Sequence, residues 1–235
     1  MSTLKKQKPI NDWESHIEKF GKNMEAVGVK RFRDIYIEKT ENGKVGAEIG
    51  KDREVTIKSL LKLSLGCENN YVEITDPNLK GLDTIINGEP ISIKSPMADW
   101  KKKGMPMQCT VKWREHNFEN IKENFTIDNH LLYVGFWKTE YSGPSIYFIP
   151  KHVQLEIIEE VGIDKYLNIK PNGTTVFIPR RIMDKLVKHP ETLIYSLSWE
   201  NIDMSKCQNG AIEKEMKILG EMLKEKGLGT KYNLL

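Results

Sequence analysis

The chain has 235 residues, of which 39% are hydrophobic and 29% are charged, and this is the composition of an ordinary globular protein. No apolar run is long enough to span a membrane, and no apolar segment follows the N-terminal lysines as it would in a signal peptide, so we expect a cytoplasmic protein. The three cysteines lie far apart, which argues against a zinc site and against a disulfide framework. A net charge of +3 does not by itself indicate a nucleic-acid partner, so the local placement of positive charge matters more.

The first third of the chain is expected to hold two helices. Asp12 is a capping residue type, and the apolar residues from Trp13 to Met24 recur at helical spacing, which predicts an amphipathic helix that ends before Gly28. The basic segment 29–40 then looks extended, and Asn42-Gly43 predicts a tight turn. Further on, Ile57, Leu61 and Leu65 predict a second helix within residues 50–66, with Gly66 as its stop. The segment 71–76 follows this helix.

Residues 81–96, GLDTIINGEPISIKSP, read as two short strands around Asn87-Gly88. Both residues of this dipeptide adopt positive φ angles easily, and that is what a type I′ hairpin turn requires. We therefore expect an antiparallel hairpin at this point of the chain.

The second half of the chain alternates strands and helices. Strands are expected within 109–113, 130–137, 145–150 and 193–199, and a closing amphipathic helix within 211–227. The order strand, Phe-Ile-Pro, two basic residues, helix occurs twice, at 147–158 and 176–187. Proline suits the first turn of a helix, so each copy predicts a strand-to-helix junction. Together these elements predict one α/β domain over residues 1–235, with a central mixed β-sheet flanked by helices.

The predicted hairpin carries an acid on one strand and an amine on the other. Side chains two residues apart share a face of a strand, so Ser92 aligns with Lys94, and folding at the turn brings both near Asp83. A carboxylate on such a rigid support can ligate a hard divalent cation, and a nearby lysine can orient or deprotonate water or stabilise phosphate charge. The alternative interpretation is a cross-strand salt bridge on a solvated face, which contributes about 0–1 kcal/mol.

The pattern Gly, apolar residue, Asp83, strand, Asn-Gly, strand, Ser92-Ile93-Lys94 resembles the core motif of the PD-(D/E)XK nuclease superfamily, in particular of type II restriction endonucleases. The resemblance covers roughly residues 46–96. It implies a restriction-endonuclease-like fold, with Asp83 as the metal-binding aspartate and Lys94 as the catalytic lysine. Ser92 occupies the position that usually holds Asp or Glu, and the backbone carbonyl of Ile93 is a further candidate metal ligand.

Members of this superfamily often add a glutamate from a preceding helix, and Glu54 lies in the matching place, with Glu48 as the second candidate. Glu54 shares a helical stripe with Ile57 and Leu61, so burial of these two residues aims Glu54 toward the edge of the sheet. Its alternative role is that of a first-turn acid that interacts favourably with the helix dipole. The resemblance implies that Asp83 and Glu54 bind Mg²⁺ and that Lys94 assists an attacking water.

Candidate DNA contacts follow the hairpin and the two proline junctions. Positive charge beside an aromatic residue or at a helix N-terminus suits phosphate contact, and an exposed methionine can wedge between bases. Solvated lysines and core methionines are the alternative interpretation. The candidates are Trp100, Lys101, Lys102, Lys103, Met105, Lys151, Arg180 and Arg181, with a further basic patch at Lys30, Arg31 and Arg33.

From these observations we expect a type II restriction endonuclease that hydrolyses double-stranded DNA at a short specific site with Mg²⁺. Palindromic sites match two-fold symmetry, so a homodimer is expected. The chain has neither a GxxxxGK[ST] loop nor a GxGxxG motif, so no nucleotide cofactor is expected. A structure-selective repair nuclease, a junction resolvase and a non-catalytic DNA-binding module remain the alternatives.

Overall fold

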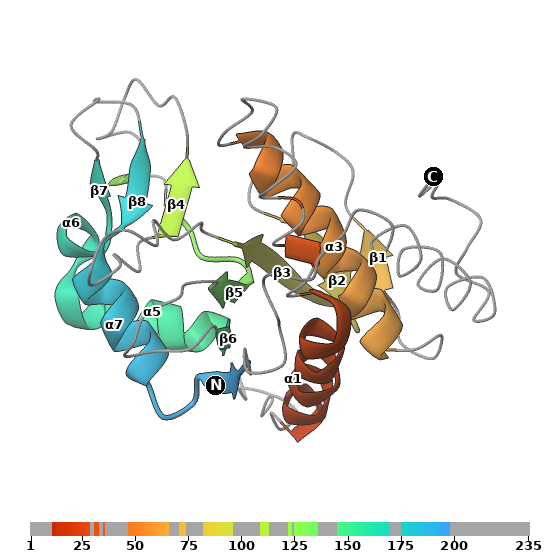
Figure 1. Cartoon of the computed structure of the whole chain (residues 1–235). Coiled ribbons are helices and arrows are strands. Elements are labelled where there is room, and N and C mark those ends of the chain that lie inside the picture. The colour runs from red at the N-terminus through yellow and green to blue at the C-terminus, as the bar shows by residue number, and fades with distance from the viewer. Residues whose placement is uncertain are drawn as a thin grey trace.

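A six-stranded sheet and a three-stranded sheet, both packed against helices, make up the fold (Figure 1). The structure, a computed structural model, describes residues 11–28, 31–32, 35, 47–65, 71–73, 82–95, 109–112, 122–123, 125–135, 145–169 and 175–197. The predicted turn at Asn42-Gly43, the segment 100–105 and the predicted helix within 211–227 lie outside these residues. The expectation of one domain over residues 1–235 stays a prediction.

The larger sheet has the strand order β1-β2-β3-β5-β6-β9. Its strands are β1 (Tyr71–Glu73), β2 (Thr84–Ile86), β3 (Glu89–Lys94), β5 (His130–Gly135), β6 (Ser145–Ile149) and β9 (Leu193–Ser196). Neighbouring strands run antiparallel except for β3 and β5, which are parallel, so the sheet is mixed as expected. The smaller sheet is antiparallel and consists of β4 (Cys109–Lys112), β8 (Val176–Ile178) and β7 (Asn168–Ile169).

The helices of the described residues fall into two groups on the two sides of the larger sheet (Figure 1). One group consists of α1 (Asn11–Asn23), the π-helical turn η1 (Met24–Gly28) and α3 (Ala47–Leu65). The other consists of α5 (Lys151–Val161), α6 (Ile163–Tyr166) and α7 (Arg180–Lys188). No helix in the described ranges has the length and apolar character needed to cross a membrane.

Alternation along the strands of the larger sheet produces two hydrophobic cores. Leu132 and Val134 of β5 face a core shared with α1 and α3, whereas Leu131 and Tyr133 face a core shared with α5, α7 and the smaller sheet. All four residues are at most 4% exposed. Because β5 is buried on both faces, it is a continuous apolar run, and full burial of each leucine or valine contributes about 1.5–3 kcal/mol.

Both Phe-Ile-Pro segments form the predicted strand-to-helix junctions. Pro150 joins β6 to α5, and Pro179 joins β8 to α7. Each proline is the N-cap residue, one position before the first turn that was expected, with φ of −58° at Pro150 and −71° at Pro179. These angles are close to the value that the proline ring imposes, so the ring favours the start of each helix.

Two local predictions near the N-terminus are wrong. The first helix begins at Asn11, so Asp12 lies inside it, and the helical path continues through a π-helical turn that includes Gly28. The segment 29–40 was expected to be extended, but its described residues, Arg31, Phe32 and Ile35, are helical. Phe32 and Ile35 are at most 4% exposed, so burial of their side chains outweighs the weak strand preference of the local sequence.

Candidate active site

The hairpin of β2 and β3 forms as the sequence predicts. Asn87 and Gly88 have φ of 52° and 84°, the positive values of a type I′ turn. Thr84 pairs with Ile91 and Ile86 with Glu89, so the strands are in register from the turn onward.

Asp83, Ser92 and Lys94 lie on one face of this hairpin. Ile91 and Ile93 are buried in the core shared with α1 and α3, so the alternating residues Ser92 and Lys94 belong to the opposite face. Asp83 continues β2 toward this position, because its backbone N–H donates to the carbonyl of Ile91 at 3.0 Å.

The Asp83 carboxylate is the meeting point of these residues. Its Oδ2 accepts hydrogen bonds from the backbone N–H of Ile93 at 2.6 Å and from the hydroxyl of Ser92 at 3.3 Å. Lys94 Nζ lies 3.9 Å from the same oxygen, and the side chains of Lys94 and Asp83 are 29% and 17% exposed. The structure thus brings together the acid and the amine that the sequence pattern singles out, in a partly buried site where charges are screened less than at the surface.

Lys94 also lies near two buried polar side chains, Tyr133 and Cys109. Its register partner on β5 is the buried Tyr133, and burial raises the pKa of this phenol well above its usual value. Burial also raises the pKa of the Cys109 thiol to about 11, although the nearby positive charge of Lys94 lowers it. Lys94 therefore lies at the edge of a core that contains the neutral polar groups of Tyr133 and Cys109. Sequence reasoning had not linked Lys94 to Cys109.

Glu54 lies on α3 and forms an ion pair with Lys58 at 2.8 Å. The helix packs on the sheet face opposite to Lys94, and Ile57 and Leu61 are buried as expected. Across the described residues, no group of three or more His, Cys, Asp or Glu side chains is placed to hold a metal ion, so the structure does not bring Glu54 together with Asp83 in such a cluster. Glu48 lies in the first turn of α3, and its side chain is outside the description.

Arg53, next to Glu54, is a residue that sequence reasoning missed. Its side chain is buried, lies over the ring of Phe32 at 6.0 Å, and has its pKa lowered to about 10 by that burial. The signal was present in the sequence, because Arg53 precedes Ile57 by four residues and therefore shares the buried stripe of the helix.

The described candidates for DNA contact occupy two different places. Arg180 and Arg181 begin α7 directly after β8, whose Ile178 pairs with Cys109, the neighbour of Lys94. Arg180 is half exposed and lies 4.0 Å from Asp184. Lys151 instead begins α5 beside His130, at the end of β5 away from Tyr133, and is 3.8 Å from Asp128. Trp100, Lys101, Lys102, Lys103, Met105, Lys30 and Arg33 lie outside the described residues.

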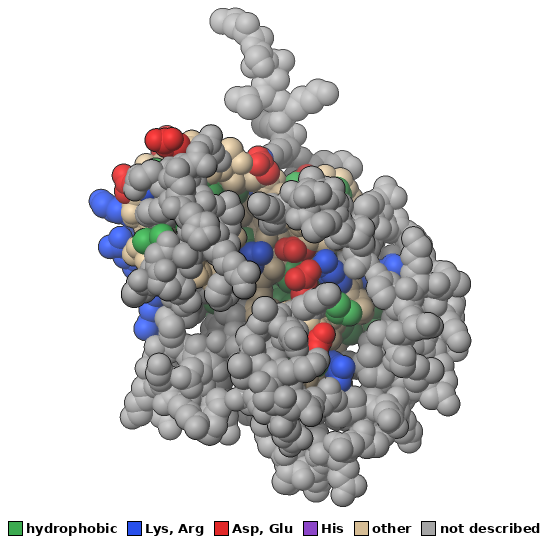
Figure 2. Space-filling view, turned by 90° about the horizontal axis from the view of Figure 1, so that it is seen from above, with side chains coloured by type: hydrophobic (Ala, Val, Ile, Leu, Met, Phe, Trp, Pro, Cys, Tyr) green, Lys and Arg blue, Asp and Glu red, His purple; other side chains and the backbone are tan. Residues whose placement is uncertain are grey.

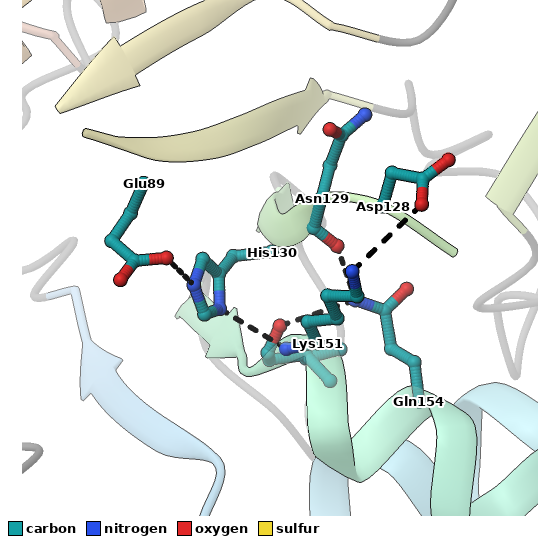
Figure 3. A network of polar contacts seen from close by, with 7 residues as sticks. Glu89, Asp128, Asn129, His130, Lys151 and Gln154 are labelled. Carbon is teal, nitrogen blue, oxygen red and sulfur yellow. Dashed lines mark hydrogen bonds and ion pairs between the residues drawn. The ribbon is translucent and has the colours of Figure 1, made fainter. Parts of the chain in front are cut away.

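A second polar network surrounds His130 at the opposite end of β3 and β5 (Figure 3). His130 Nε2 lies 3.2 Å from Glu89 Oε2, and its Nδ1 accepts the backbone N–H of Lys151 at 3.0 Å. Gln154 donates to the carbonyl of Asn129 at 3.0 Å. Both ring nitrogens of His130 therefore have protein partners, which gives this histidine a structural role at the start of α5.

Acidic and basic side chains lie directly beside one another near the middle of the view in Figure 2, which looks down on the molecule from above. In this view the described residues carry charges of both signs. Local geometry around particular residues is therefore more informative than net charge, as the value of +3 already indicates.

Comparison with known proteins identifies the family. The protein-family model described as restriction endonuclease ThaI matches residues 23–218, which is most of the chain. The chain belongs to the ThaI restriction endonuclease family. This membership confirms the function expected from the hairpin motif, that of a type II restriction endonuclease, and confirms that the protein is a site-specific endonuclease.

A solved structure supports the fold of this ThaI family member. A restriction endonuclease in complex with substrate DNA has 24% sequence identity to the chain, with a TM-score of 0.67 over 90% of this chain and 99% of that chain. The expected restriction-endonuclease-like α/β fold is therefore confirmed. A search of the curated proteins found no match. Restriction endonucleases are generally metal-dependent.

Proposed function

We propose that Asp83 and Lys94 form the catalytic centre with which this restriction endonuclease hydrolyses phosphodiester bonds of double-stranded DNA. The observation that carries the proposal is the 3.9 Å distance between Lys94 Nζ and Asp83 Oδ2 on one face of a rigid hairpin. The family membership supplies the reaction. This pair is the acid and the amine of the hairpin motif that resembles the core of the PD-(D/E)XK nucleases.

The cation that we propose for this centre is Mg²⁺. A carboxylate and a backbone carbonyl are hard oxygen donors, which Asp83 and Ile93 provide, and Mg²⁺ is commonly held by one or two carboxylates while it keeps several waters. The absence of a larger acidic cluster among the described residues suits such a site better than a cage built entirely from protein ligands. When bound, the cation would supply Lewis acidity and would neutralise charge on the phosphate.

Lys94 has a role that its position supports directly. Its amine, 29% exposed and next to an apolar core, can hold or transfer a proton at Nζ or stabilise negative charge that develops on the phosphate. Ser92 lies between the two residues in the motif, and we assign it to the same centre. Glu54 is our candidate for the upstream acid; that role requires it to exchange its ion pair with Lys58 for the cation.

For DNA binding we propose Arg180 and Arg181 as phosphate contacts near the catalytic centre. They occupy the N-terminus of α7, where backbone N–H groups and the helix dipole also favour anions. We assign Lys151 to a DNA contact that lies farther from the catalytic centre. A further DNA contact is assigned to the segment that follows the hairpin, with Trp100, Lys101, Lys102, Lys103 and Met105. The solved restriction endonuclease with the similar fold was determined with its substrate DNA, which supports an interface of this kind.

The catalytic assignment is tested by Lys94→Ala. We expect the substitution to lower the rate of plasmid cleavage in Mg²⁺ by about 100-fold or more, the loss typical of a missing proton-transfer group. DNA binding in Ca²⁺ should stay close to that of the wild type, because the proposed binding contacts, Arg180 and Arg181, are unchanged. Gel assays of cleavage and a binding titration provide the two measurements.

The matched control is Lys19→Ala, which removes an exposed lysine from α1. This variant should cleave at the wild-type rate. Cleavage by Lys94→Ala at that same rate would show that the assignment of Lys94 is wrong.

A further inference from the structure

The Asp83 carboxylate is held asymmetrically. The N–H of Ile93 at 2.6 Å, the hydroxyl of Ser92 at 3.3 Å and Nζ of Lys94 at 3.9 Å all approach Oδ2. Among the residues that the structure describes, no donor contacts Oδ1. Among the described residues, the two oxygens of this carboxylate therefore have different environments, because three protein groups approach Oδ2 and none of them approaches Oδ1.

The direction of the Ser92 hydrogen bond is fixed by chemistry. An ionised carboxylate can only accept, so the hydroxyl of Ser92 donates its proton to Oδ2. A hydroxyl used in this way is a poor replacement for the carboxylate that usually occupies this position of the motif, because hard cations prefer charged oxygen ligands. Groups that hydrogen-bond to a metal-binding carboxylate orient it and tune its affinity.

We propose that Ser92 is a positioning residue that anchors Asp83 through Oδ2, so that Oδ1 is the oxygen that binds the divalent cation. This inference rests on the proposed function of Asp83. In the motif, the position of Ser92 usually holds an acidic metal ligand. In this chain, Ser92 would instead be a hydrogen-bond donor that orients the carboxylate of Asp83. The second anchor is the backbone N–H of Ile93, which is kept by every substitution at that position except proline.

The test compares the binding of Mn²⁺ to the full chain, followed by electron paramagnetic resonance, across variants of position 92. Ser92→Ala removes the donor and should weaken Mn²⁺ binding about 10-fold, the lower end of the effect of losing such a partner. Ser92→Thr keeps a hydroxyl on a β-branched residue that suits a strand, and should bind Mn²⁺ nearly as the wild type does. In cleavage assays, the half-saturating Mg²⁺ concentration of Ser92→Ala should rise while the rate at saturating Mg²⁺ changes little.

A matched serine control and a thiol variant separate the possible roles of Ser92. Ser59 is half-buried on α3 and donates to the carbonyl of Val55, so Ser59→Ala should leave Mn²⁺ binding unchanged. Ser92→Cys should weaken Mn²⁺ and Cd²⁺ binding by the same factor if the side chain only orients Asp83. If the side chain ligates the metal, the softer thiol should shift preference toward Cd²⁺, and that result would overturn the inference.

Asp83→Asn distinguishes failure of the inference from failure of the proposed function. Loss of Mn²⁺ binding in Asp83→Asn, together with wild-type affinity in Ser92→Ala, would overturn the positioning role and leave the catalytic centre as proposed. Wild-type affinity in Asp83→Asn would overturn the centre itself. If Ser92→Ala does not fold, as judged by thermal unfolding, the threonine and cysteine variants carry the comparison.

Discussion

Cys109 and Lys94 show how a single charge can lie beside a buried reactive group without activating it. The thiol is 2% exposed, and its burial raises its pKa to about 11 even though the positive charge of Lys94 acts in the opposite direction. Desolvation therefore outweighs the Coulombic attraction of the thiolate to the amine. The neutral thiol behaves as a small apolar side chain between the two sheets.

We therefore predict that Cys109 resists alkylation in the native protein. The thiolate is the reacting species, and a pKa of about 11 leaves little of it at pH 8. Treatment with iodoacetamide at pH 8, followed by mass spectrometry of the peptide that contains Cys109, should find it unmodified in the folded protein and modified in urea. Rapid modification under native conditions would contradict the buried position of the thiol.

The start of helix α5 depends on a residue from another element. Its N-cap residue, Pro150, makes no side-chain capping bond, and the N–H of Lys151 instead donates to Nδ1 of His130. The proton of the neutral ring is then on Nε2, which faces Glu89. The ring also stacks on Phe148, with their centroids 5.2 Å apart, so His130 joins β3, β5, β6 and α5.

This arrangement predicts that stability falls as the solution becomes mildly acidic. Burial lowers the pKa of His130 below the usual 6.5, Glu89 raises it, and His152 and Lys151 lower it. Between the lowered native pKa of His130 and 6.5, the unfolded state therefore binds more protons than the native state. The contribution of neutral His130 to the free energy of unfolding is complete above pH 6.5 and is lost as the pH falls through that interval. Urea unfolding at a series of pH values should show this decrease.

His130→Asn provides the comparison, because an asparagine oxygen can still accept the N–H of Lys151 but does not titrate. Its free energy of unfolding should depend less on pH in the same interval than that of the wild type. His152→Asn, which removes an exposed histidine paired with Glu191, should retain the dependence that originates at His130. Identical pH profiles for the wild type and His130→Asn would show that His130 is not the titrating group.

At the scale of the whole molecule, local features were predictable and long-range pairing was not. The hairpin and the two proline junctions depend on a few adjacent residues whose backbone preferences are strong, so they were predicted correctly. The sequence alone did not indicate that β8 belongs to the smaller sheet, where it pairs with β4 and β7. That choice depends on contacts between residues far apart in the chain, as does the pairing of His130 with the start of α5.

The same contrast holds for the candidate site. Strand alternation and the hairpin turn predicted from sequence that Asp83, Ser92 and Lys94 lie together. The burial pattern of β3 and the contact between Lys94 and Asp83 agree with that prediction. The direction of Glu54 was harder to predict, because Arg53 and Glu54 both fall within reach of the buried stripe of α3 and only packing decides which one is buried.

We predict that the intact enzyme is a homodimer. An enzyme that cuts both strands of a palindromic site is most simply built with matching two-fold symmetry. Sedimentation equilibrium of the full chain with a duplex oligonucleotide in Ca²⁺ should give a protein mass of about twice 27.2 kDa per duplex. One 27.2 kDa chain per duplex would contradict the prediction.

The tight turn at Asn87-Gly88 has a consequence for how the proposed catalytic groups are assembled. Asp83 and Lys94 are carried by adjacent strands that close on each other over a very short loop, so little chain entropy is lost when they meet. Contacts of such low sequence separation need little loop closure before they form, and their spacing is set locally by the hairpin. Substitutions that weaken the packing of either outer layer should therefore cost this enzyme thermal resistance well before they alter the spacing of its reactive atoms.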